Sequence, residues 1–132
     1  MVIVDLNIIF DLWHQDPVWC SWSGLQLRTL SATHDMAINA FIYAEISARF
    51  SFQANLDKAV DELGLIVLEI SREAAFLAGK AFQQYRRQGG NRSNVLPDFF
   101  IGAHDASLRC DLLTRDSWPY STYFPTVPLI AP

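Results

Sequence analysis

The amino-acid sequence predicts an α/β domain with a central, mainly parallel sheet of about five strands flanked by helices. Short apolar runs rich in Val, Ile and Leu recur along the chain, and segments with helical spacing separate them. Strands that alternate with helices are typical of a parallel sheet covered on both faces. The chain has 132 residues, 51% of them hydrophobic, and we expect a single domain over residues 1–132.

The expected elements follow one another without an internal repeat or linker. Strands are expected at residues 1–4, 36–38, 65–68, 111–114 and 127–130. Helices are expected at 6–13, 16–30, 40–50, 52–63, 72–88 and 97–108, with a turn or short helix near 117–120 and a polar loop at 91–96. Asp16-Pro17 is a plausible helix start, Asn39 and Ser71 are expected N-caps, and Gly64 is a helix stop.

Composition bounds the possible functions without choosing one. The net charge of −4 argues against binding nucleic acid through broad positive charge, but it leaves room for a nuclease whose carboxylates hold metal ions. Cys20 and Cys110 lack metal-type spacing, and we expect reduced thiols in a cytoplasmic protein. No apolar run approaches the roughly 18 residues of a membrane span, and the first residues do not resemble a secretory signal.

Four carboxylates stand where an α/β fold could bring them together, and each also has an ordinary structural explanation. Asp5 and Asp98 precede helices, where an acid caps the first turn or interacts with the helix dipole. Glu45 lies in a mostly apolar helix and could form a pair with Arg49, four residues later. Asp116 fits an ordinary turn.

Together these four acids suggest a metal site. Sites in parallel sheets gather beyond the carboxyl ends of the strands, and Asp5 and Asp116 each follow an apolar strand. Carboxylates that converge repel one another unless cations lie among them, and oxygen ligands suit Mg²⁺ or Mn²⁺ rather than zinc. Spacing alone does not show that the side chains meet, so both explanations stay open.

Four segments, in order, carry a resemblance to a known family. They are Val4-Asp5-Leu6-Asn7, Ala40 to Ile46, Leu96 to His104, and Leu113 to Asp116 followed by Tyr120 to Pro132. Nearly from end to end, the chain resembles the PIN-domain family and, within it, the VapC toxins. It departs from the family at Leu6, where serine or threonine is common, and at Asp105, where a small residue is expected.

The resemblance implies a Mg²⁺-dependent endoribonuclease, with Mn²⁺ as an alternative ion, which hydrolyses RNA phosphodiesters with a metal-activated water. It implies that the catalytic metal ligands are Asp5, Glu45, Asp98 and Asp116. It also implies that Asn7 and Thr114 are supporting polar residues. It also implies the toxin of a toxin–antitoxin pair, which would bind a VapB-like antitoxin and form a homodimer.

Basic and aromatic side chains near these segments have two interpretations each. The candidates for RNA contact are Arg86, Arg87, Arg92 and Arg115, and the same residues also fit solvated positions near a helix end. The tryptophans of the first two helices, Trp13, Trp19 and Trp22, are expected in the core or, where exposed, as an anchor for the antitoxin. We expect His104 to be a hydrogen-bonded structural residue and Asp105 to pair with Arg109.

Two other function classes, and one other kind of nuclease, are alternatives to the ribonuclease. A phosphatase of the haloacid-dehalogenase type would need an acid two residues after Asp5, where the chain has Asn7. A catalytically weak PIN-like module that binds RNA or a protein remains the alternative, although such a module should have lost one or more of the four acids. A structure-specific DNA nuclease is disfavoured by the small size of the chain.

Overall fold

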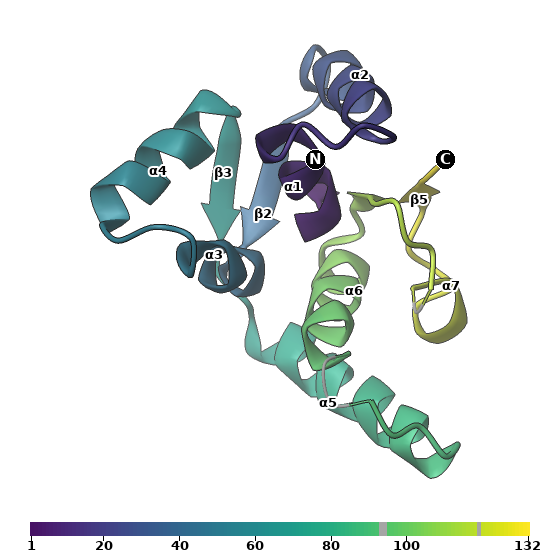
Figure 1. The fold of residues 1–132 in the computed structure, drawn as a ribbon. Helices are drawn as coiled ribbons and strands as arrows, with labels where there is room; N and C mark the ends of the chain where they lie inside the picture. The colour runs from purple at the N-terminus through teal and green to yellow at the C-terminus, as the bar shows by residue number, and fades with distance from the viewer. Residues whose placement is uncertain (93–94, 119) are drawn as a thin grey trace.

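A computed structural model describes residues 1–92, 95–118 and 120–132 (Figure 1). The helices are α1 (Leu6–Trp13), α2 (Cys20–Ser31), α3 (Ala40–Ser47), α4 (Gln53–Glu62), α5 (Arg72–Arg87), α6 (Leu96–Leu108) and α7 (Tyr120–Tyr123). The strands are β1 (Val2–Val4), β2 (Met36–Asn39), β3 (Leu65–Leu68), β4 (Asp111–Leu113) and β5 (Leu129–Ile130). The expected α/β order is confirmed.

The five strands form one parallel sheet in the order β3-β2-β1-β4-β5. β1 lies in the middle, where Val2 pairs with Met36 of β2 on one side and with Asp111 of β4 on the other. All residues of β1 are fully buried, so the strand is a continuous apolar run. Because β1 and β4 are parallel neighbours, Asp5 and the residues after β4 reach the same edge of the sheet.

Local sequence accounts for several helix boundaries. Asn39 Oδ1 accepts a hydrogen bond from the backbone N–H of Ile42 at 3.0 Å, and Ser71 Oγ accepts one from Ala74 at 3.1 Å, so both expected N-caps are confirmed. Gly64 has a φ of +70°, a conformation that glycine adopts without strain and that terminates α4.

One helix start differs from the expectation. α2 begins at Cys20 rather than at Asp16-Pro17. The backbone amides of Val18 and Trp19 both donate to Asp16 Oδ1 at 2.8 Å, so the aspartate side chain stabilises a turn ahead of the helix.

The last strand is shorter than expected, and the short helix before it lies later in the chain. β5 covers only two residues, and the short helix expected near 117–120 forms at 120–123. Two residues of the expected loop at 91–96, residues 93–94, lie outside the described part of the chain. Across the described ranges, no helix is both long and apolar enough to cross a membrane, and both cysteines are free.

α6 is placed so that the acid in its first turn faces neighbouring elements. It contacts α3, α5 and α7. The contact with the α7 segment depends on Gly102, because a Cβ at that position would collide with the ring of Phe124. This close approach brings Tyr120 of α7 and Asp98 of α6 to one cavity.

Candidate active site

A cavity of about 230 Å³ opens at the carboxyl ends of β1 and β4. Its walls come from α1, the start of α6, and the segment between β4 and α7. It is lined by Asp5, Leu6, Asn7, Phe10, Asp98, Arg115, Asp116, Trp118 and Tyr120. Three of the four predicted acids therefore line one cavity, together with one predicted supporting residue, Asn7.

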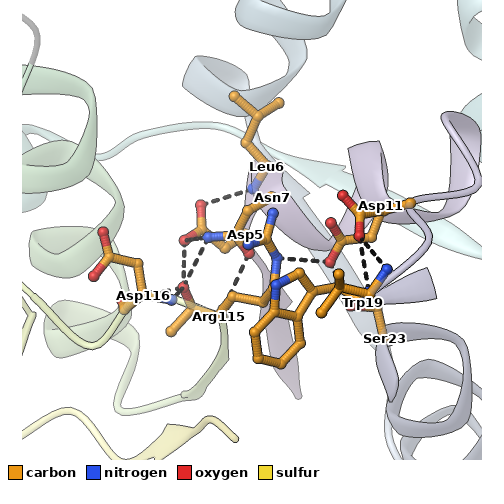
Figure 2. Close-up of polar contacts among 11 residues, drawn as sticks. Asp5, Leu6, Asn7, Asp11, Trp19, Ser23, Arg115 and Asp116 are labelled. Carbon is orange, nitrogen blue, oxygen red and sulfur yellow. Dashed lines mark hydrogen bonds and ion pairs between the residues drawn. The ribbon is translucent and has the colours of Figure 1, made fainter. Parts of the chain in front are cut away.

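Asp5 lies at the bottom of this cavity and is only 4% exposed. Its Oδ1 accepts a hydrogen bond from Leu6 N–H at 2.7 Å, which is the capping role expected for an acid at this position. Its Oδ2 accepts from Asn7 Nδ2 at 3.1 Å (Figure 2). The same oxygen accepts from Thr114 Oγ1 at 2.6 Å and from Tyr120 Oη at 3.2 Å. Burial raises the pKa of Asp5, and the hydrogen bonds from Thr114, Leu6 and Tyr120 oppose the rise.

The electrostatics of Asp98 link all four acids. Burial raises the pKa of Asp98 to about 7, and repulsion from Asp5, Glu45 and Asp116 adds to that rise. Glu45, which α3 contributes, also has a raised pKa because of burial and the nearby charge of Asp5. The pKa values of Asp98 and Glu45 are therefore both raised by burial and by the charges of neighbouring acids.

Asp116 occupies the open side of the cavity. Its side chain is exposed, and its Oδ1 accepts a hydrogen bond from Trp118 N–H at 3.1 Å, as the turn explanation expects. Its backbone N–H donates to Thr114 Oγ1 at 3.0 Å. Figure 2 shows the Asp116 carboxylate standing apart from that of Asp5.

The acids fit a hard divalent cation in type but are not yet gathered around one point. Carboxylate oxygens with amide and hydroxyl neighbours suit Mg²⁺. Burial causes most of the rise in the pKa of Asp98, and the charges of Asp5, Glu45 and Asp116 add a smaller part that a cation would relieve. In the part of the chain that the structure describes, however, no three acid, histidine or cysteine side chains are close enough to hold one ion.

The four predicted RNA-contacting arginines fall into two groups. Arg115 lines the acidic cavity, and Arg92 lines an adjoining cavity with Tyr85, Asp116 and Trp118. The Arg92 guanidinium lies 5.6 Å from the centre of the Trp118 ring. Arg86 and Arg87 lie in the last turn of α5 and line neither cavity, which agrees with the helix-end interpretation for these two residues.

Neither the possible Glu45–Arg49 pair nor the expected Asp105–Arg109 pair forms. Arg49 does not pair with Glu45, because its Nη1 lies 2.8 Å from His14 Nε2 and its guanidinium covers the ring of Phe10. Asp105 does not pair with Arg109. Its side chain is fully buried, whereas Arg109 is the exposed left-handed C-cap of α6 with a φ of 56°.

Two buried polar side chains of α6 have atoms without a hydrogen-bond partner among the described residues. Both carboxylate oxygens of Asp105 are unpaired among the described residues, and burial together with the charge of Asp5 raises its pKa well above the usual value. His104 is buried, as expected of a structural residue, but its Nδ1 has no partner within the described ranges. The expectation that His104 is hydrogen-bonded through its side chain is therefore not met at Nδ1.

Trp13 of α1, Trp22 of α2 and Trp19, which precedes α2, do not form an exposed anchor. Trp13 packs on Phe50 and Trp19 packs on Trp22, and all three tryptophans are partly buried. The exposed tryptophan is Trp118, at 37%, beside the acids.

Several residues of the site were missed in the sequence. Tyr120 falls within the C-terminal segment of the resemblance, and Asp11 and Trp118 are not among the predicted site residues. Asp11 lies four residues after Asn7, on the same side of a helix, and this spacing was an available signal. Tyr120 and Asp5, which form a hydrogen bond, lie 115 residues apart in the sequence, so no local sequence pattern predicts their contact.

Comparison with solved structures identifies the fold. No protein-family model and no curated protein matches the chain. It aligns with a chain of VapBC2 from Rickettsia felis bound to promoter DNA, with a TM-score of 0.74, 18% identity, and coverage of 99% of this chain and 98% of that one. It aligns with VapBC-1 from nontypeable Haemophilus influenzae with a TM-score of 0.67 and 21% identity, covering 99% of this chain and 98% of that one. It aligns with FitAcB from Neisseria gonorrhoeae with a TM-score of 0.64 and 16% identity, covering 98% of this chain and 96% of that one.

These matches extend over essentially the whole chain at low identity. The chain therefore has the fold of the VapC and FitB PIN-domain toxins of toxin–antitoxin complexes. The predicted resemblance and the predicted fold class are confirmed at this level.

Proposed function

We propose that this protein is a Mg²⁺-dependent endoribonuclease that acts as the toxin of a VapBC-type pair, with residues 1–132 forming one PIN domain. The observation that carries the proposal is the cavity that Asp5, Asp98 and Asp116 line together at the carboxyl edge of a PIN-type sheet. Ligand sites of open α/β sheets lie at this edge, and several carboxylates gathered there are suited to binding a cation.

Asp5, Glu45, Asp98 and Asp116 would hold the ion, Mg²⁺ or Mn²⁺. When bound, such an ion lowers the pKa of a coordinated water and stabilises charge on the phosphate during hydrolysis. Asn7, Thr114 and Tyr120 orient Asp5 by donating hydrogen bonds to its Oδ2.

Substrate binding is assigned to the rim of the acidic cavity. Arg115 and Arg92 lie next to the acids and provide planar guanidinium groups for phosphate oxygens. Trp118 provides an exposed ring on which an unpaired base could stack. Arg86 and Arg87 are more distant candidates that would contact the RNA backbone away from the reacting phosphate.

A VapB-like antitoxin and a second copy of the toxin are the proposed protein partners. The VapBC2 neighbour was crystallised bound to promoter DNA, and another neighbour is a toxin–antitoxin complex from Klebsiella pneumoniae. The half-buried Trp13, Trp19 and Trp22 are poor candidates for the antitoxin anchor, so the contact would use other exposed apolar side chains. The largest exposed ones include Phe52 on the loop before α4 and Phe76 on α5.

A catalytically weak PIN-like binding module is the second candidate. It is favoured by the lack of any three acids close enough to share one ion among the described residues. All four acids are nevertheless retained and three line one cavity, so the nuclease is preferred.

The deciding experiment uses toxin purified free of antitoxin and incubated with total RNA in Mg²⁺ or EDTA. Asp98→Asn, which keeps the size of the side chain, is the matched variant. The proposal expects discrete products that require both Mg²⁺ and Asp98. Uncleaved RNA in the presence of folded protein that binds Mg²⁺ by calorimetry would favour the binding module.

A further inference from the structure

Asp11 is a buried carboxylate that takes no part in the proposed metal site. It lies on α1 and is 2% exposed. A single oxygen, Oδ2, accepts hydrogen bonds from Ser23 Oγ of α2 at 2.6 Å and from Arg115 Nε at 2.8 Å (Figure 2). A buried carboxylate with an arginine partner forms a short, charge-assisted hydrogen bond of defined direction.

Arg115 is held from three sides. Its Nε donates to Asp11, its guanidinium carbon lies 5.4 Å from the centre of the Trp19 ring, and its backbone N–H donates to Asn7 Oδ1 at 3.1 Å. The side chain is 29% exposed and lines the cavity that contains Asp5. Within the described part of the chain, its two Nη groups donate no hydrogen bond, so they remain available to a ligand.

We propose that Asp11 is a positioning residue that orients Arg115 toward a phosphate of the RNA backbone, beside the acids of the cavity. This inference rests on the proposed nuclease function. The hydrogen bond at Nε and the ring of Trp19 fix the plane of the Arg115 guanidinium. The side chain therefore loses less conformational entropy when a phosphate binds. Ser23 in turn fixes the carboxylate of Asp11.

Asp11 also keeps Arg115 from neutralising the metal site. An arginine without this partner, in the same cavity as Asp5 and Asp116, would be attracted to either carboxylate. Pairing with Asp11 leaves those acids for a cation and keeps the guanidinium at the rim, so the two roles do not compete.

The direction in which RNA affinity changes on Asp11→Asn distinguishes a positioning role of Asp11 from a simple effect of its charge. Replacing Asp11 by Asn removes a negative charge, and on charge alone the variant should bind a polyanion more tightly. If Asp11 instead positions Arg115, Asp11→Asn should bind RNA more weakly in spite of its more positive charge.

The test uses the full chain, Ca²⁺ in place of Mg²⁺ to suppress cleavage, and a single-stranded oligouridylate, with affinity measured at several salt concentrations. Asp11→Asn and Arg115→Gln should each weaken binding about tenfold, as for loss of a hydrogen bond to a charged group. Each should also reduce the slope of log K against log salt by about 0.7, the value for one phosphate contact on a single strand.

The double variant should bind no more weakly than Arg115→Gln alone, because both changes remove the same contact. Glu62→Gln, which removes the same charge by breaking the exposed Lys58–Glu62 pair 3.9 Å apart, is the matched control and should bind RNA as tightly as the wild type or slightly more tightly. Ser23→Ala, which deletes one partner of Asp11, provides a milder variant if Asp11→Asn fails to fold.

Unchanged or tighter RNA binding by folded Asp11→Asn or Ser23→Ala, with the wild-type salt slope, would overturn the inference and leave Asp11 a purely structural residue. If the wild type cleaves RNA in that case, the proposed function still stands. Conversely, a wild type that fails to cleave RNA but loses affinity on Asp11→Asn would remove the nuclease and keep the positioning role.

Discussion

Thr114 and Asp5 are separated by 109 positions in the sequence, yet Thr114 Oγ1 donates a hydrogen bond to Asp5 Oδ2 at 2.6 Å. The same hydroxyl accepts hydrogen bonds from Asn7 Nδ2 and from the backbone N–H of Asp116. One threonine therefore joins the ends of β1 and β4 and connects the buried acid of the cavity to the exposed one.

Replacing Thr114 by Val should weaken both the fold and cation binding. Valine keeps the shape but leaves Asp5 without its shortest hydrogen bond from a side chain, which should cost about 1–3 kcal/mol of unfolding free energy. Because that bond lowers the pKa of Asp5, its loss should raise the pKa further and reduce Mg²⁺ affinity at neutral pH. Urea unfolding and calorimetry measure the two effects, and Thr114→Ser, which retains the hydroxyl, is the control.

The stability of the metal-free protein should decrease as pH rises toward neutrality. The pKa of Asp98 is about 7 in the folded protein and near 3.8 when unfolded, so the folded state holds more protons between these values. The stabilising contribution of protonated Asp98 is fully present below pH 3.8 and is lost as pH rises through about 7. Thermal unfolding in EDTA from pH 5 to 8 should show this decline.

The Asp98→Asn variant should show a smaller decline over the same pH range, since its amide does not titrate. Mg²⁺ should stabilise the wild type more at pH 8 than at pH 5, because the ion binds the deprotonated acids. Equal pH dependence of the two proteins would contradict the assigned pKa of Asp98.

Asp105 should be a source of instability. Its fully buried carboxyl group has no hydrogen-bond partner among the described residues, so Asp105→Ala should stabilise the fold by about 1 kcal/mol. The gain should grow with pH, because the raised pKa makes ionisation of the buried acid costly in the wild type. Chemical denaturation at two pH values tests this, with the exposed Asp61→Ala as control; a destabilised Asp105→Ala would indicate a partner for the carboxyl group.

Arg92 should contribute to RNA binding without affecting the cation. Its guanidinium lies over Trp118 in the cavity next to Asp116, where a phosphate and a base could bind together. Arg92→Ala should raise KM for RNA cleavage while Mg²⁺ affinity stays unchanged. Arg87→Ala, in the last turn of α5, should have a smaller effect, and equal effects would place the RNA along that helix instead.

Local sequence determined where the helices and strands of this protein form, and it pointed to the four acids of the proposed site. Apolar runs such as Val2–Val4 have few alternatives to a buried strand, and caps such as Asn39 and Ser71 act through hydrogen bonds within three residues. The four predicted acids could also be found locally, because each stands in a short segment that resembles the PIN-domain family. These acids are Asp5, Glu45, Asp98 and Asp116. Boundaries were less predictable where a side chain such as Asp16 stabilised a turn instead of a helix.

The tertiary structure alone decided which partner each polar side chain has. Sequence spacing favoured pairs four residues apart, but Arg49 contacts His14, Asp105 has no partner among the described residues, and Asp11 binds Arg115. An exposed pair within one helix gains only about 0.2–0.5 kcal/mol, which packing easily overrides. Parallel strands, by contrast, bring residues more than a hundred positions apart to one sheet edge, where burial strengthens each contact.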